Sequence, residues 1–283
     1  MNDNIPTKSN SDAYPLNRDF LASLRLNLQH YVWTSSLGYL LHPAIRVKEH
    51  LLIADIGCGT GIASVELAKH LSTGSRVEGF DLSLEQCPPQ GWRPENVTFQ
   101  ELDIFGIIPE HLLGRYDVVF IRHFICVVQS GNPMPLLSAL LSLLKPGGYL
   151  QWQEWDLATN KVLVVEPATS ASKMEAFMNL GSHSVKKQAA WVGRFDTMFD
   201  RDVDAELIAC DRHRTAKKAM MMKQEINFLT VREWCERLRA EDPESAQAAQ
   251  LEKLANEAFG ECLRQGRGTV IDCEMVTWVV RKI

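Results

Sequence analysis

The sequence has no surplus of positive charge, no paired cysteine motif and no apolar run long enough to cross a bilayer. Lys and Arg number 30 against 35 Asp and Glu, a formal charge of −5, so we expect no nucleic-acid or membrane partner. None of the seven cysteines stands at a C-x-x-C spacing, which argues against a disulfide framework and a metal site. The first 15 residues lack the apolar core of a signal peptide. We therefore expect a small-molecule partner, no metal, and a cytoplasmic protein, with the nucleus as the alternative location.

The 283 residues are 46% hydrophobic and 23% charged, which is typical of a packed globule. Residues 1–16 are polar and Pro-containing, and we expect a flexible tail. A helix should follow, with Asn17 as its N-cap and Asp19 in its first turn. Its apolar residues recur at helical spacing from residue 20 to residue 32, so one face should be covered. The helix should stop near the Pro at position 43, which makes residues 17–48 an N-terminal helical cap.

Short apolar runs then alternate with helical stretches, which predicts an α/β fold with a mostly parallel sheet and helices on both faces. Seven strands are expected, at residues 51–55, 76–81, 97–102, 116–122, 149–154, 205–210 and 274–281. Helices are expected at residues 62–71, 135–144, 169–189, 190–200, 218–239 and 244–264. The helices before the last strand predict a helical cap over the edge of the sheet that binds the ligand.

The sharpest motif is the run ADIGCGTG at residues 54–61, a strand that leads through a glycine turn into a helix. Such turns let a ligand approach the backbone closely. A dinucleotide fingerprint, G-x-G-x-x-G, would need a glycine where Ile62 stands after Gly57 and Gly59. Asp55 would also repel a pyrophosphate but could recognise an ammonium or sulfonium group. The spacing, with its third glycine at Gly61, therefore disfavours a nicotinamide dinucleotide.

A G-x-G-x-G turn after an Asp-ended strand resembles the first motif of class I methyltransferases that use S-adenosylmethionine (SAM). The resemblance implies a Rossmann-like fold and a SAM site at Asp55 and the three glycines. It further implies that Asp81, with Leu82, takes the ribose hydroxyls, because a carboxylate can accept both hydrogens. Asp103 and Ile104 match the residues on the adenine side.

Two longer runs are similar to fungal methyltransferases of the LaeA-like group, which is linked to secondary metabolism. They are FDLSLEQCPPQGWRPENV at residues 80–97 and LKPGGYLQWQE at residues 144–154. The resemblance implies a SAM-binding core at residues 49–156, with residues 157–283 completing the sheet and inserting a substrate cap. It also implies methyl transfer to an O or N atom of a small fungal natural product, polyketide-like or alkaloid-like.

In that fold the donated methyl group faces the end of the fourth strand, where Arg122 and His123 stand. His123 could serve as the base, or it could be a hydrogen-bonded core residue. Arg122 could contact the cofactor, or could pair with Asp103 or Glu154. Glu154 could bind the substrate, or could only cap a helix or loop.

Aromatic residues predict an apolar pocket for a flat or lipophilic acceptor. We expect Tyr31, Trp33 and Trp155 to contact the substrate, although core packing explains Tyr31 equally well. The wider set of candidates also contains Tyr14, Trp152 and Trp191. Two other functions stay open: a pericyclase or cyclase that keeps SAM as a structural ligand, and a LaeA-like regulatory protein with a protein partner.

Overall fold

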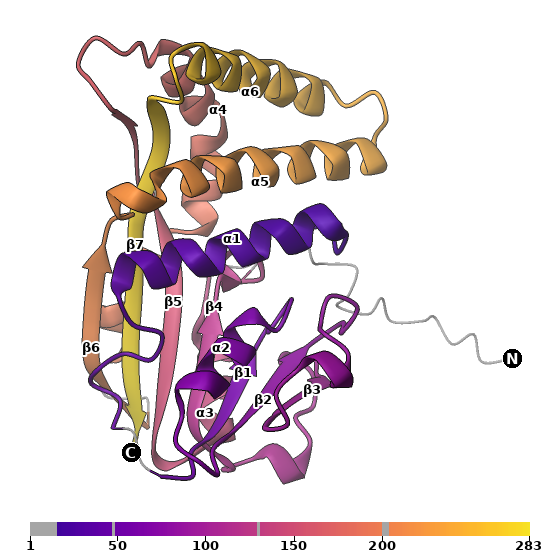
Figure 1. Cartoon of the computed structure of the whole chain (residues 1–283), viewed down its shortest axis with the longest axis vertical. Coiled ribbons are helices and arrows are strands. Elements are labelled where there is room, and N and C mark those ends of the chain that lie inside the picture. Colours follow the sequence, from indigo (N-terminus) through magenta and orange to yellow (C-terminus); the bar gives the residue numbers. More distant parts are fainter. Residues whose placement is uncertain (1–15, 47–48, 129–130, 200–203) are drawn as a thin grey trace, which may run out of the picture.

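The computed structural model describes residues 16–46, 49–128, 131–199 and 204–283, and its centre is a seven-stranded sheet (Figure 1). The strand order is β3-β2-β1-β4-β5-β7-β6, and only β7 runs against its neighbours. The strands are β1 (Leu52–Ile56), β2 (Arg76–Asp81), β3 (Val97–Glu101), β4 (Tyr116–Arg122), β5 (Leu144–Val164), β6 (Ala205–His213) and β7 (Thr269–Lys282). The expected mostly parallel, Rossmann-like sheet is confirmed.

The register of the parallel strands brings their carboxyl ends to one edge. Asp55 in β1 lies beside Gly79 of β2 and Phe120 of β4, so the loops that follow these three strands leave the sheet together. Central parallel strands are buried on both faces and therefore carry continuous apolar runs, as β1 does. In such sheets the ligand site forms where the strands end.

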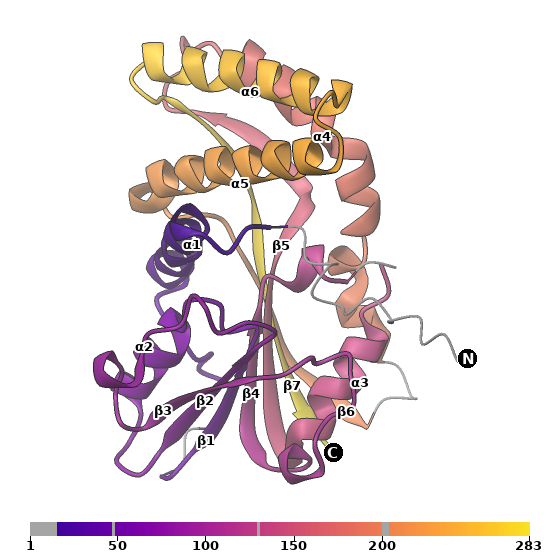
Figure 2. The same ribbon diagram turned by 90° about the vertical axis from the view of Figure 1, so that its right-hand side faces the viewer.

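Helices cover both faces of the sheet and rise above its ligand edge. Figure 2 shows α2 (Ile62–His70) and α3 (Met134–Leu143) on opposite sides of the strands. The helices α1 (Phe20–Leu37), α4 (Ser172–Gln188), α5 (Met220–Glu241) and α6 (Ala246–Arg264) lie above that edge (Figures 1 and 2). The long strands β5 and β7 pair over almost their whole length, with a bulge after Asp156, and so join the upper helices to the sheet.

The first helix differs from the expectation at both ends and on its buried face. Its N-cap is Asp19, whose side chain accepts a hydrogen bond from the Ala22 N–H at 2.8 Å; Asn17 lies outside it. The helix ends at Leu37 because Gly38 takes the left-handed conformation at φ +77°, which favours glycine. The apolar face that should be covered is largely exposed, with Phe20 at 95%.

Other predicted elements are confirmed with shifted ends. The expected helix at residues 190–200 is a 3-10 helix, η5 (Val192–Phe199), and the strands β5, β6 and β7 are longer than expected. Trp152 and Trp191 are fully buried and belong to the main core, together with Phe195 and Trp278. Residues 1–15 of the predicted tail, with Tyr14, lie outside the described residues.

Candidate active site

A cavity of about 1060 Å³ opens where the strands end, between the sheet edge and the upper helices. Ten of the residues predicted from sequence line it: Asp55, Gly57, Gly59, Asp81, Leu82, Asp103, Ile104, Arg122, His123 and Trp155. Gly61, Tyr31, Trp33 and Glu154 are not part of its lining. The volume is at the upper end of the range for small-molecule sites.

The glycine turn requires glycine for two physical reasons. Gly57, Gly59 and Gly61 have φ of +69°, +53° and +70°, a region in which a side chain is strained. A Cβ at Gly57 would also lie 2.3 Å from the Phe124 ring, and one at Gly61 would lie 2.4 Å from the Phe99 ring. The turn is therefore bare backbone, packed against rings, on the floor of the cavity.

Carboxylates surround this turn. The Ser64 hydroxyl donates to Asp55 at 2.6 Å, and burial raises the pKa of Asp55 to about 6. The Gly59 N–H donates to Asp81 at 2.9 Å; burial raises the pKa of Asp81, an effect that this hydrogen bond opposes. Two carboxylates on a floor with little solvent favour a cationic or hydroxyl-bearing ligand over an anionic one.

The loop after β3 supplies the remaining wall of this part of the cavity. Asp103 accepts a hydrogen bond from the Phe105 N–H at 3.0 Å, an Asx turn that places Ile104 and Phe105 in the cavity wall.

The loop after β2 contributes Cys87, which the sequence did not single out. Its thiol donates a hydrogen bond to the Gly59 carbonyl at 3.2 Å and so stabilises the glycine turn.

At the end of β4, His123 occupies an unusual position. Its φ is +64°, and its ring stacks on Trp155 at 5.9 Å between centroids and meets Trp33 edge-on at 5.4 Å. Both ring nitrogens are buried and have no hydrogen-bond partner among the described residues. Burial, reinforced by the Arg122 and Lys223 charges, holds the pKa of His123 well below its ordinary value. The imidazole is therefore neutral and can accept a proton.

Arg122 lies beside His123 in the cavity wall, with its guanidinium 4.8 Å from the Phe120 ring centroid. Burial lowers the pKa of Arg122 to about 10, and the nearby Asp55 opposes that shift, so the group keeps its charge at neutral pH. Its Nη2 atom is buried without a hydrogen-bond partner in the described part of the chain. Among the described residues, Arg122 forms neither of the two ion pairs considered from sequence, with Asp103 or with Glu154.

Glu154 lies behind the cavity wall and holds the backbone that follows His123. Its carboxylate accepts hydrogen bonds from the Phe124 N–H at 2.6 Å, the Trp152 indole N–H at 2.8 Å and the Ile125 N–H at 3.3 Å. The residue is 0% exposed, and burial raises its pKa to about 8. In this position it can orient the β4 end but does not reach the cavity.

The three aromatic candidates occupy different depths. Trp155 lines the cavity, whereas Trp33 packs behind it with ring centroids 5.1 Å apart and is 1% exposed. Tyr31 is 48% exposed on the outer side of α1. The structure thus brings Trp33 and Trp155 together with His123, but not Tyr31.

The upper part of the cavity is built by residues that the sequence did not single out. It is lined from α4, α5 and α6 by Phe177, Met178, Lys223, Ile226, Thr230, Val231, Trp234 and Leu251, among others. In the sequence, helical spacing accounts for most of them as packing residues. Only Lys223 could have been recognised from the sequence as more than a packing residue, because a lysine is rare among the buried positions of a helix.

Comparison with known proteins shows that this chain is similar to methyltransferases. A family model described as a methyltransferase domain matches residues 45–242. Methyltransferase grgD of Penicillium sp is 35% identical over 140 residues, 47% of this chain and 48% of the relative. N-methyltransferase tcpN of Claviceps purpurea is 32% identical over 171 residues, 59% of this chain and 57% of the relative. The chain spans about half the length of the curated relatives it matches.

Among solved structures, a SAM-dependent methyltransferase from Thiobacillus denitrificans in complex with S-adenosyl-L-homocysteine is 16% identical. The match covers 90% of this chain and 98% of that chain, with a TM-score of 0.48. Within the described ranges, no helix is both long and apolar enough to span a membrane. The same residues contain no cluster of three or more His, Cys, Asp or Glu side chains that could hold a metal ion.

Proposed function

The chain belongs to the methyltransferase-domain family, and from this premise we propose that it binds SAM and methylates an O or N atom of a small fungal natural product. One observation carries the proposal. A single cavity joins the glycine turn, the strand-end carboxylates Asp55, Asp81 and Asp103, and the neutral imidazole of His123, which has no hydrogen-bond partner among the described residues. The apolar helices above the sheet complete the enclosure on the acceptor side.

The residues at the sheet edge fit SAM by their chemistry. The glycine turn presents backbone without side chains to the cavity at Gly57 and Gly59, so a ligand can lie against it. Asp81 can accept both ribose hydroxyl hydrogens, and Asp55 and Asp81 together favour the positive charges of SAM. The buried Nη2 of Arg122, which has no partner among the described residues, suits the SAM carboxylate. A pyrophosphate would instead meet Asp55 and Asp81 and be repelled.

When bound, SAM supplies a methyl group that is already electrophilic because a positively charged sulfur carries it. The protein then has to hold the acceptor in line, keep water out and receive a proton. His123 is placed to receive the proton that the acceptor O–H or N–H loses, since its ring nitrogens have no hydrogen-bond partner among the described residues. The pKa lowered by burial keeps the ring neutral before the reaction. Glu154 fixes the backbone that follows His123 through the Phe124 and Ile125 N–H groups.

The chemical class of the proposed methyl acceptor is inferred from the lining of the cavity and from the curated relatives. The walls above the sheet are mainly apolar, with Phe177, Ile226 and Leu251 among them, which suits a lipophilic molecule larger than an amino acid. The curated relatives come from fungi, and two of them are named N-methyltransferases. Nitrogen is therefore our first choice of acceptor atom, and oxygen our second.

The test begins with SAM binding, measured by titration calorimetry on the wild-type protein, Asp81→Asn and Glu85→Gln. Glu85 follows Asp81 in the same loop, but it is exposed and does not line the cavity. Loss of charge-assisted hydrogen bonds to the ribose should weaken SAM binding to Asp81→Asn by about 10- to 100-fold, while Glu85→Gln stays unchanged. Equal affinities for all three proteins would contradict the assigned cofactor site.

Turnover is tested by incubating the protein with methyl-labelled SAM and extracts of a metabolite-producing fungus. Label in one organic-soluble product, absent with Asp81→Asn, would support small-molecule methyl transfer and identify the acceptor. Tight SAM binding without label in any fraction would favour the cyclase or the regulatory function instead.

A further inference from the structure

Lys223 of α5 is a buried cation that faces the cavity and has no counter-ion among the described residues. The residue is 5% exposed and lines the upper part of the cavity. Its ammonium lies 3.4 Å from the Trp155 ring centroid, and its hydrogen-bond contact is the Cys273 sulfur at 3.9 Å. Burial raises the pKa of Cys273 to about 11, so that thiol is neutral and supplies no negative charge. An ammonium has three hydrogens to donate, and one weak sulfur acceptor does not satisfy them.

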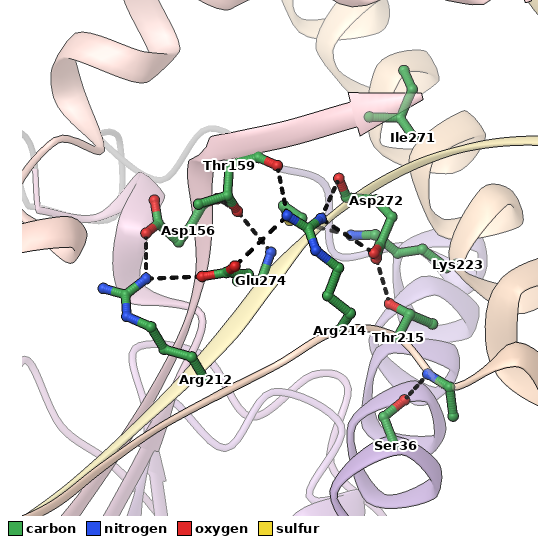
Figure 3. A network of polar contacts seen from close by, with 12 residues as sticks. Ser36, Asp156, Thr159, Arg212, Arg214, Thr215, Lys223, Ile271, Asp272 and Glu274 are labelled. Carbon is green, nitrogen blue, oxygen red and sulfur yellow. Dashed lines mark hydrogen bonds and ion pairs between the residues drawn. The ribbon is translucent and has the colours of Figure 1, made fainter. Parts of the chain in front are cut away.

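The neighbouring cations, in contrast, are compensated by carboxylates, as Figure 3 shows. Arg212 contacts Asp156 at 2.7 Å and Glu274 at 3.1 Å, and Arg214 contacts Asp272 at 3.4 Å. Asp156 lies on β5, and Asp272 and Glu274 lie on β7. Each of them is engaged by an arginine, and no described carboxylate lies within 4.0 Å of the Lys223 ammonium.

The Trp155 ring face and the Cys273 sulfur attract the Lys223 ammonium but bring no negative charge. A buried ammonium without a counter-ion is costly, and the cost is recovered when a ligand brings the missing negative charge. We infer that Lys223 binds an ionised oxygen, a carboxylate or a phenolate, on an otherwise apolar acceptor whose body packs against Trp155 and the helices above it. The inference rests on the proposed function, because it assigns the charge of the methyl acceptor.

The position of Lys223 assigns this anion to the acceptor and not to SAM. Lys223 comes from α5 and lies beside Ile226 and Asn227, whereas the glycine turn and Asp81 come from the sheet edge. At the sheet edge, Arg122 has a buried Nη2 atom with no hydrogen-bond partner among the described residues, and this cation already suits the SAM carboxylate. Arg122 and Lys223 would therefore each take a separate anion, one at the sheet edge and one on the acceptor side.

The test uses two small aromatic molecules of nearly the same shape, 2-naphthoate and its neutral counterpart 2-naphthamide. Their affinities are measured by quenching of tryptophan fluorescence, in the presence of S-adenosylhomocysteine and without it, so that no turnover is needed. The proteins are the wild type, Lys223→Met and the control Lys217→Met. Lys217 is an exposed lysine six residues earlier and does not line the cavity. A third probe, 7-hydroxycoumarin, reports by its excitation spectrum whether a bound phenol is ionised.

We expect the wild-type protein and Lys217→Met to bind 2-naphthoate at least tenfold more tightly than 2-naphthamide. Lys223→Met should bind both equally, and it should unfold at a higher temperature because a buried charge has been removed. A preference for naphthoate identifies a carboxylate site. Ionisation of bound 7-hydroxycoumarin in the wild type and in Lys217→Met, but not in Lys223→Met, identifies a phenolate site.

Two results would overturn the inference. One is equal or undetectable binding of 2-naphthoate and 2-naphthamide by the wild-type protein together with no ionisation of bound 7-hydroxycoumarin, a result that does not depend on how any variant folds. The other is a preference that survives in Lys223→Met. SAM affinity, measured separately, distinguishes this failure from failure of the proposed function, because Lys223→Met should bind SAM as the wild type does.

Discussion

Replacing Glu154 with glutamine should remove a specific dependence of stability on pH. The carboxylate is fully buried, and its two shortest hydrogen bonds, from the Phe124 N–H at 2.6 Å and the Trp152 indole at 2.8 Å, end on the same oxygen. A glutamine can keep both with its carbonyl oxygen. Only the longer bond from the Ile125 N–H, at 3.3 Å, would face an amide nitrogen. Glu154→Gln should therefore fold, and it differs from the wild type mainly in having no proton to lose.

The sign and size of the effect follow from the two pKa values. Burial raises the pKa of Glu154 from 4.5 to about 8 in the folded protein. Between these values the folded chain holds a proton that the unfolded chain has released, so the free energy of unfolding falls as the pH rises. One pH unit corresponds to about 1.4 kcal/mol. Between pH 5 and pH 8 the wild type should lose about 4 kcal/mol relative to Glu154→Gln.

Urea denaturation followed by tryptophan fluorescence at pH 5, 6, 7 and 8 measures this difference. Other titrating groups, Asp55 and the buried histidines among them, are present in both proteins and cancel in the comparison. Glu110→Gln is the matched control, since Glu110 is exposed, and its stability should run parallel to that of the wild type. If Glu154→Gln also runs parallel to the wild type within about 0.5 kcal/mol, a smaller change than a typical mutation produces, the argument from burial is refuted.

Two further predictions concern the floor of the cavity and the packing of α1 on α5. Gly57→Ala should lower the free energy of unfolding by about 2–4 kcal/mol, because it adds a clash with Phe124 to the cost of the left-handed backbone. Gly114→Ala, at φ +60° with open space around it, should cost only about 1 kcal/mol; equal losses in urea denaturation would contradict the clash. Glu233→Gln should cost about 3–5 kcal/mol, because it leaves the Arg25 guanidinium buried without its carboxylate at 2.6 Å. The double variant Arg25→Met with Glu233→Leu should recover most of the melting temperature, and no recovery would mean that the pair is not what destabilises the single variant.

The sheet was predictable because its signals are local. Short apolar strands separated by turns and helices predict a parallel sheet, and Asp55, Asp81 and Arg122 stand at strand ends that the parallel register brings to one edge. The glycine turn was equally local, since its three alternate glycines directly follow a strand in the sequence, and the positive φ angles of these residues favour glycine.

The upper helices were less predictable because their burial depends on distant partners. The buried face of α1 carries Arg25, a residue that periodicity assigns to solvent, and it is buried because Glu233 of α5 neutralises it 208 positions away. The same packing leaves Phe20 exposed. No pattern within α1 contains that information. The role of Glu154 was hidden for a similar reason, since its partners are backbone N–H groups at the end of another strand.

The distribution of charge in the cavity bears on the role that we propose for His123. Carboxylates gather at the sheet edge around the glycine turn, and the cations Arg122 and Lys223 flank His123 from the sheet and from α5. A sulfonium placed at the sheet edge would lie near Asp55 and Asp81, and an acceptor anion would lie near Lys223, so that the two reactants are oriented toward each other by opposite fields. Between them the cations and burial hold the pKa of His123 well below its ordinary value. Because the nearby cations destabilise the protonated ring, His123 can hold a proton taken from the acceptor only transiently. The proton must then leave for solvent before the next turnover. Because the pKa of His123 is held well below its ordinary value, the proposed methyl transfer should lose no rate as the pH falls through 6.5, where an ordinary histidine becomes protonated, and a loss of rate there would contradict the lowered pKa.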